Sequence, residues 1–287
     1  EGAGWQVATH GLRVRGRGFG AHARGGLRWQ GDGSRPRIDL AVRVDDAALP
    51  VAKGFWVRHR MSPGALHWLD AAFLGGHVRD GRAVISGDLD DWPFADRDGL
   101  FEATGRIDGG RVRFQPDWPA TDSLDGRVRF FGRGFDFHGS ARLAGIAIPT
   151  VHAGIDRYGG GTLTVSAEGG DDAARLLALL RRSPLQKTYG ETFRSLAASG
   201  PARATFDLRL LMRPQARARI GGEVRLDGAR LADTRWKLAF DQVRGRIVYR
   251  ADGVLADALQ VRREGQPGRL ALRIGDYVRE PRNAVEV

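Results

Sequence analysis

The stretch Ala204-Thr205-Phe206-Asp207-Leu208-Arg209-Leu210-Leu211-Met212 carries an apolar side chain at every second position, in the longest such run of the sequence. Successive side chains of a β-strand point to opposite faces, so this run predicts a strand with one apolar face. Shorter runs with the same period are Ile38, Leu40, Val42 and Val44; Leu163, Val165 and Ala167; Val224 and Leu226; Trp236, Leu238 and Phe240; and Leu270, Leu272 and Ile274. We therefore predict a mainly β protein, built from an antiparallel sheet with one apolar face.

Aspartate-glycine pairs separate many of these runs. Both residues tolerate the backbone conformations of tight turns, so we predict a hairpin or bulge corner at each pair. The pairs are Asp80-Gly81, Asp108-Gly109-Gly110, Asp125-Gly126, Asp227-Gly228 and Asp252-Gly253. The sheet should then be a meander in which strands that are adjacent in sequence pair in space.

A short amphipathic helix is predicted over residues 63–74. Ser62 can cap its first turn, and Pro63 suits the first helical position because the missing N–H has no helical partner there. Gly75-Gly76 should end the helix in a left-handed turn. Apolar residues follow at helical spacing on one face: Ala65, Leu66, Leu69, Ala72 and Phe73.

The period becomes helical again over residues 171–198. Asp171 or Asp172 can cap a first helix, and Pro184 separates it from a second, which Ser199-Gly200-Pro201 should end. The apolar stripe of the first helix should lie against the apolar face of the sheet; it consists of Ala173, Leu176, Leu177 and Leu180. This helical insert, at 169–201, divides the chain into a sheet over 1–168 and a sheet over 202–287.

Composition excludes several classes of protein. With 41 glycines spread through 287 residues and no cysteine, the chain is neither a collagen nor a disulfide scaffold. No stretch approaches the roughly 18 apolar residues of a membrane span, and no signal peptide is present. The net charge of +11 comes mostly from dispersed arginines, such as Arg127 and Arg129 around Val128. This spacing indicates the solvent face of a sheet, so we expect no specific nucleic-acid partner.

The sequence gives little support for catalysis. The seven histidines form no HxH or HExxH motif, and no Gly-x-Ser-x-Gly motif is present. Gly16-Arg17-Gly18-Phe19-Gly20 differs in spacing from a dinucleotide-binding fingerprint. Asp88, Asp90 and Asp91 are the best candidates for an acid and base pair, but they border a predicted turn. We expect no enzyme activity, no metal and no cofactor.

Several anchors occur in a distinctive order between residues 61 and 119. They are the helical stretch 61–76, then Gly87 to Phe94 with Trp92-Pro93-Phe94, then Gly99-Leu100-Phe101, and then Phe114-Gln115-Pro116-Asp117-Trp118-Pro119. The proline-containing anchors cannot be central strands and should be loops or edges that hold an aromatic residue in the core. In order and spacing, these anchors resemble the central region of the YhdP family, the large AsmA-like proteins of Gram-negative envelopes. With 222–229, 240–245 and Asp252-Gly253, the resemblance covers the chain from about residue 36 onward.

This resemblance implies an extended, strongly curved antiparallel sheet, folded like a taco shell around a hydrophobic groove. Residues 1–287 would form one segment of that β-groove within a larger protein. The implied function is the movement of phospholipids between the inner and outer membranes, in support of outer-membrane biogenesis. The chain would lie in the periplasm, with an inner-membrane anchor outside these residues. Phospholipid acyl chains are the expected partners, and membranes would be contacted through parts outside this chain.

The predicted groove lining consists of alternating apolar residues. These are Val112, Phe114, Val128, Phe130, Leu163, Val165, Phe206, Leu208, Leu210, Val224, Leu226, Trp236, Leu238, Phe240, Leu270 and Leu272. Two alternatives stay open at this point. The apolar faces could pack on each other as a β-sandwich. The chain could also be a structural or polysaccharide-binding β domain of the envelope, in which Trp92, Trp118 and Trp236 face sugar.

Overall fold

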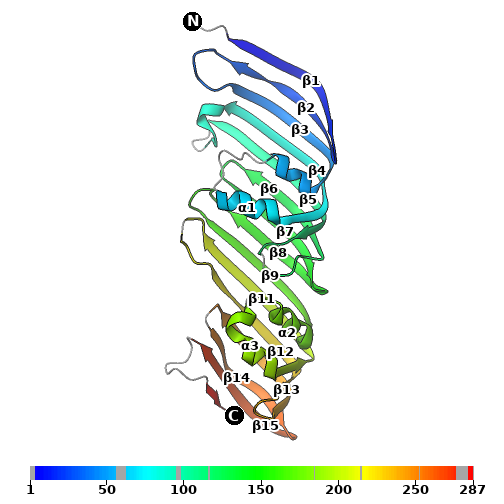
Figure 1. Cartoon of the computed structure of the whole chain (residues 1–287), viewed down its shortest axis with the longest axis vertical. Coiled ribbons are helices and arrows are strands. Elements are labelled where there is room, and N and C mark those ends of the chain that lie inside the picture. The colour runs from blue at the N-terminus through cyan, green and yellow to red at the C-terminus, as the bar shows by residue number, and fades with distance from the viewer. Residues whose placement is uncertain are drawn as a thin grey trace. The chain divides into compact units, whose positions relative to one another are not determined.

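The computed structural model describes residues 4–55, 63–94, 98–115, 117–183, 185–213, 215–251, 253–275 and 284–286. Most of these residues lie in β-strands, and neighbouring strands run antiparallel (Figure 1). The sheet order is β1 to β9 and then β11 to β16, while β10 pairs with β12 beside this path. Strands that are adjacent in sequence therefore pair, which confirms the predicted antiparallel meander.

The chain divides into two compact units. The first unit contains Glu1–Phe114, Thr121–Gly139 and His152–Thr162, and the second contains Gln115–Ala120, Ser140–Val151 and Leu163–Val287.

Few helices accompany the strands. The elements are β1 (Trp5–Gly16), β2 (Phe19–Trp29), β3 (Arg37–Ala48), η1 (Leu49–Phe55), α1 (Pro63–Ala72), β4 (Phe73–Asp88), η3 (Leu89–Asp91), β5 (Gly99–Val112), β6 (Ser123–Phe131), β7 (Gly134–Leu143), β8 (Ile146–Ile155), β9 (Thr162–Asp172), α2 (Ala173–Arg181), α3 (Leu185–Ser195), β10 (Leu196–Ser199), β11 (Pro201–Leu211), β12 (Arg219–Asp233), β13 (Leu238–Arg250), β14 (Gly253–Arg263), β15 (Gln266–Gly275) and β16 (Ala284–Glu286).

Most of the aspartate-glycine pairs lie inside strands. At Asp227-Gly228 the pairing of β12 with β13 shifts register, and Gly228 has a φ of 80°. A register shift also accompanies Asp80, whose φ is 54°, in the pairing of β4 with β5. These sites are β-bulges, where one strand carries an extra residue and bends without ending. The predicted corners therefore take the bulge form here, and the strands continue through them.

Two other pairs show the limits of the turn prediction. Gly253 begins β14 directly after the connection from β13, so a hairpin corner is confirmed there, although Asp252 lies outside the described residues. The prediction of a corner at Asp125-Gly126 is wrong, because Gly126 lies within β6 and pairs with Ile107. A Cβ atom on Gly126 would lie 2.4 Å from the carbonyl oxygen of His138. This glycine therefore permits a close approach of backbones rather than a turn.

Helix α1 confirms the predicted helix but ends earlier than residue 74. Its predicted cap, Ser62, lies outside the described residues. The chain passes directly from Ala72 into β4, and Phe73 pairs with Val112 of β5. The prediction that Gly75-Gly76 ends the helix is wrong, because both glycines lie within β4. Gly76 has a φ of 102°, and a Cβ there would lie 2.6 Å from Gly110 Cα.

Helices α2 and α3 form the predicted insert. The carboxylate of Asp172 accepts hydrogen bonds from the backbone N–H groups of Ala174 (2.8 Å) and Gly200 (2.7 Å), which confirms the cap. These two bonds lower the pKa of Asp172. The predicted end of the second helix is wrong: α3 ends at Ser195, and Leu196–Ser199 form β10. Residues 196–199 pair with β12, so strand pairing takes over from the helix.

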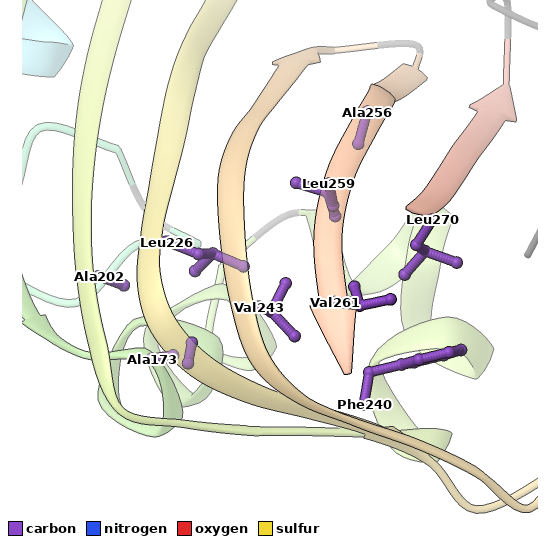
Figure 2. Packing of buried hydrophobic residues seen from close by; sticks show 10 residues of the cluster. Ala173, Ala202, Leu226, Phe240, Val243, Ala256, Leu259, Val261 and Leu270 are labelled. Atoms are coloured by element: carbon purple, nitrogen blue, oxygen red, sulfur yellow. The ribbon is translucent and has the colours of Figure 1, made fainter. Parts of the chain in front are cut away.

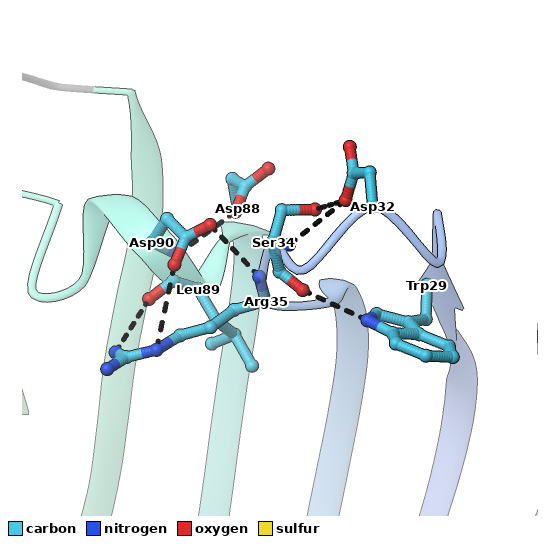
Figure 3. A network of polar contacts seen from close by, with 7 residues as sticks. All are labelled: Trp29, Asp32, Ser34, Arg35, Asp88, Leu89 and Asp90. Carbon is cyan, nitrogen blue, oxygen red and sulfur yellow. Dashed lines mark hydrogen bonds and ion pairs between the residues drawn. The ribbon is translucent and has the colours of Figure 1, made fainter. Parts of the chain in front are cut away.

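The loop between β2 and β3 is tied to the turn after β4 by polar contacts (Figure 3). The backbone N–H of Arg35 donates to Asp90 Oδ2 (3.0 Å), and its guanidinium Nε lies 3.6 Å from Asp90 Oδ1. Asp88 accepts from the backbone N–H of Asp90 (3.0 Å), which caps η3. Trp29 Nε1 donates to the carbonyl oxygen of Ser34 (2.9 Å). Two of the three carboxylates considered for catalysis, Asp88 and Asp90, therefore hold the chain in place at this turn.

Candidate functional site

The second unit has one apolar sheet face. In the pairing of β11 with β12, Ala204 lies opposite Val224 and Leu208 opposite Ile220, and directly paired residues point to the same side. Val224 is in turn paired with Ile247 of β13. We call this surface the apolar face. Its paired residues are Ala202, Ala204, Phe206, Leu208, Ile220, Val224, Leu226, Ala229, Leu231, Phe240, Ile247 and Tyr249.

The apolar face continues over β14 and β15. Leu259 pairs with Leu270 and Ala256 with Leu272. Figure 2 shows β11, β12 and β13 bending along their length, with the side chains of Leu226 and Val243 on the inner side of the bend. The apolar face is therefore concave in this part of the sheet.

Burial divides the apolar face into two parts. Val243 and Leu259 are only 0% and 1% exposed, so the middle of β13 and β14 is a packed core. Phe206, Leu208 and Val224, on β11 and β12, are half-buried. The half-buried residues therefore offer apolar surface that a ligand could cover.

The opposite face of the same strands carries paired charges. Arg246 lies 3.3 Å from Glu223, Arg244 lies 3.3 Å from Asp227, and Arg273 lies 3.4 Å from Asp257. The hydrogen bond that Arg225 donates to Glu223 lowers the pKa of that carboxyl group. The arginines of these ion pairs thus lie on a solvated face. This is the arrangement predicted from their alternation with apolar residues.

The helical insert packs against part of the apolar face. Ala173 belongs to the buried cluster of this unit and Leu176 packs against it, while Leu177 is buried. This confirms the predicted contact of the helical stripe with the sheet. Tyr189 of α3 is 8% exposed, and its hydroxyl donates to the carbonyl oxygen of Ala251 (3.4 Å).

The insert is held at both ends of the strands it crosses. The backbone N–H of Ala173 donates to the carbonyl oxygen of Gly200 (2.8 Å), and that of Thr234 donates to Ser195 (2.9 Å). Gly200 and Thr234 flank the same ends of β11 and β12. Ala251 lies at the other end, because its N–H donates to the carbonyl oxygen of Ile220 (3.1 Å). Helices α2 and α3 therefore extend on the apolar side from one end of these strands to the other.

The first unit repeats this division of faces. Register places Leu40 opposite Ile85, and Ala103 opposite both Ala83 and Phe130. On β1 the apolar face is open, since Trp5 is 46% exposed and Val7 is 61% exposed. Charged pairs occupy the other side, where Arg129 lies 2.8 Å from Glu102.

The predicted groove residues lie in both units and differ in burial. Val128 and Phe130 share the apolar face of the first unit, because they pair with Gly105 and Ala103. In the second unit, Phe206 and Val224 lie on the open part of the apolar face, with Leu208 beside them. Buried members of the predicted set are Val112, Leu226, Phe240 and Leu270; the half-buried members are Phe114, Val128, Phe130, Leu163, Val165, Phe206, Leu208, Leu210, Val224, Leu238 and Leu272.

Trp236 differs from the other predicted groove residues. The prediction that it continues a strand with Leu238 and Phe240 is wrong, because residues 234–237 form the turn between β12 and β13. The carboxylate of Asp233 accepts from the N–H of Trp236 (3.1 Å) and so holds the turn. The indole is 47% exposed, and the guanidinium carbon of Arg235 lies 5.0 Å from the ring centroid.

The sequence pattern missed the most deeply buried positions of the apolar face. Val243, Leu259 and Val261 are nearly fully buried. Between Phe240 and Ile247 the alternation breaks, because Gln242 and Gly245 have positive φ values of 52° and 137° and the register shifts there. A strict period of two fails across a bulge. Gly245, a glycine inside an alternating run, was the sequence signal that could have located this bulge.

Other kinds of site find no support in the part of the chain that the structure describes. No group of three histidine, aspartate or glutamate side chains there could hold a metal ion. Among the same residues, no helix is both long enough and apolar enough to cross a membrane.

In each unit, an antiparallel meander has one apolar face and one face of charged pairs, which defines a β-sheet protein with a candidate apolar binding surface. Its sequence matches the model of the YhdP protein family over residues 1–286, and the chain belongs to that family. A curated relative is "Intermembrane phospholipid transporter YhdP" of Escherichia coli (strain K12), which is 24% identical over 207 residues. The match covers 71% of this chain and 16% of the relative, so the chain spans a small part of that protein's length. No solved structure matches the chain significantly.

Proposed function

We propose that this chain binds phospholipid acyl chains along the apolar faces of its sheet and forms one segment of a path between the inner and outer membranes. The observation that carries the proposal is the register of β11, β12 and β13. It places apolar side chains on one face while the opposite face carries ion pairs. Family membership and the name of the Escherichia coli relative supply the class of ligand.

Physical chemistry makes such a surface useful for moving lipids. Exposing the roughly 30 methylene groups of a two-chain phospholipid to water costs at most about 24 kcal/mol, at about 0.8 kcal/mol per group. Apolar side chains that cover the acyl chains would remove much of this cost. The half-buried residues Phe206, Leu208 and Val224 supply such cover. We propose a periplasmic location and a non-catalytic role, in which the protein lowers a barrier to transfer.

The alternative function, polysaccharide binding, has weaker support. Sugar-binding aromatic side chains need an open ring face. Trp92 is half-buried, and its ring centroid lies 5.4 Å from Phe94 and 5.1 Å from Phe101. The Trp118 ring centroid lies 6.3 Å from that of Phe206. Protein side chains thus occupy the surroundings of two of the three tryptophans proposed for sugar.

Photocrosslinking tests the proposed function. A photoreactive residue would replace Leu208 on the apolar face, and Arg209 on the opposite face in a matched control. After exposure to phospholipid vesicles and light, we expect lipid adducts at position 208 and almost none at position 209. Equal labelling at the two positions, or none at either, would contradict the proposal.

A further inference from the structure

The apolar face ends in a charged cavity at the hairpin between β14 and β15. Leu259, Val261 and Arg263 occupy alternate positions of β14, so Arg263 lies on the side of the strand that carries the apolar residues. Arg263 pairs with Gln266 of β15 at the last position of the hairpin. The row of apolar side chains therefore terminates in a cation.

This cavity is open to solvent and has a volume of about 640 Å³. Phe240 and Val261 lie at its base and are 5% and 4% exposed, so they present only a small apolar edge to it. Figure 2 shows the Phe240 side chain extending beyond β13 near the end of β14. The full lining is Phe240, Val261, Arg263, Glu264, Gln266, Pro267 and Gly268. A small apolar edge with a polar margin suits a ligand that has both characters.

The charges in the lining indicate the chemistry of that ligand. Arg263 makes no ion pair with any residue that the structure describes, whereas Arg244, Arg246 and Arg273 on the opposite face all do. Arg263 can thus donate hydrogen bonds to a phosphodiester without first breaking an ion pair with a carboxylate. Glu264, in the same lining, disfavours a headgroup of net negative charge and favours one with an ammonium group.

We propose that this cavity binds the headgroup of a zwitterionic phospholipid. Arg263 and Gln266 donate to the phosphodiester, Glu264 accepts from the ammonium, and the small exposed edges of Phe240 and Val261 border the first methylenes of the acyl chains. The inference rests on the proposed function, because the acyl chains continue from this cavity onto the apolar face. It adds a position where a headgroup is recognised and a preference between headgroups.

Native mass spectrometry of the chain with four probes tests the inference. Dihexanoyl phosphatidylethanolamine carries both charges, and dihexanoyl phosphatidylglycerol lacks the ammonium. Dihexanoylglycerol lacks the phosphate, and O-phosphoethanolamine lacks the acyl chains. We expect phosphatidylethanolamine to bind about fivefold more tightly than phosphatidylglycerol, as an exposed charge pair can supply. The other two probes should bind more weakly still.

Two variants test the contributions of Arg263 and Glu264 independently. Arg263→Gln should weaken the binding of both phospholipids about fivefold, whereas Glu264→Gln should weaken only phosphatidylethanolamine and so abolish the preference. Arg269→Gln is the matched control, because Arg269 pairs with Gln260 on the opposite face of the same hairpin. Its binding should equal that of the unmodified chain.

Two results would overturn the inference, and they differ in meaning. If the two phospholipids and dihexanoylglycerol bind equally and Arg263→Gln changes nothing, the headgroup site is refuted while acyl-chain binding stands. If no acyl-chain probe binds the unmodified chain, the proposed function fails together with the inference.

Discussion

Replacing Leu208 by aspartate should impair lipid binding while leaving the second unit folded. Leu208 is half-buried on the open part of the apolar face, so a carboxylate there can reach water in the lipid-free protein. Leu259 is 1% exposed in the packed core of the same face. A charge at Leu259 would be buried without a partner, at a cost of about 3–5 kcal/mol, comparable to the lower end of typical domain stability. Leu259→Asp should therefore unfold the unit.

The size of the binding defect follows from sheet geometry. Strands lie about 4.8 Å apart and alternate residues about 6.7 Å apart, so one position of the apolar face covers roughly 32 Å². Covering that area on both lipid and protein contributes about 1.6 kcal/mol, at about 25 cal/mol per Å². Loss of this contribution at Leu208→Asp corresponds to about 15-fold weaker binding.

Thermal melting and lipid titration of the same samples test this reasoning. Arg209→Asp is the matched control, because Arg209 neighbours Leu208 on the opposite face and pairs with Arg219. We expect Arg209→Asp to melt and bind lipid like the unmodified chain. If Leu208→Asp melts as low as Leu259→Asp, the apolar face is a closed core at both positions and the division into open and packed parts is refuted.

Three further predictions concern the sheet and its insert. Gly222→Ala should lower the melting temperature, because its Cβ would lie 2.1 Å from the carbonyl oxygen of Thr205, whereas Gly268→Ala, with its nearest neighbour at 3.7 Å, should have a smaller effect; equal melting would contradict this account. The pKa of Asp172 is lower in the folded state than in the unfolded state, so its stabilisation is complete above the unfolded pKa and is lost as pH falls through the folded pKa. When melting temperatures are measured at successively lower pH, Asp172→Asn should lose less stability than the unmodified chain. Parallel plots of melting temperature against pH for the two proteins would show that Asp172 does not contribute. Glu223→Gln should leave lipid crosslinking from position 208 unchanged, because Glu223 lies among the ion pairs of the opposite face; a large drop would mean that the charged face takes part in lipid binding.

The sequence predicted the class of fold because alternation is a direct consequence of strand geometry. Phe206 and Leu208 alternate with Asp207 and Arg209, and the structure places them on opposite faces. The sequence did not predict how far each strand extends. Asp227-Gly228 has the composition of a turn, yet pairing with β13 continues beyond it. Whether such a pair ends a strand or bends it depends on the partner strand, which local sequence does not contain.

The assignment of residues to strands and sheet faces failed for the same physical reason at Trp236 and Val243. Alternation assigned Trp236 to a strand, but the Asp233 carboxylate accepts a hydrogen bond from the N–H of Trp236 and stabilises a turn there. The bulge at Gln242 moved Val243 onto the apolar face, out of step with Leu238 and therefore out of the predicted set. Backbone irregularities thus decided which apolar residues share a face.

The bulges also connect the shape of the sheet to its proposed function. A β-bulge bends its strand and increases local twist. In the second unit, the register shifts in β12, β13 and β14 lie near the buried residues Ala229, Val243 and Leu259. A bend toward the apolar side brings these side chains together, and helix α2 adds Ala173 to the same buried cluster. The parts of β11 and β12 away from the bulges keep the half-buried residues Phe206, Leu208 and Val224, and we propose that an acyl chain covers this surface.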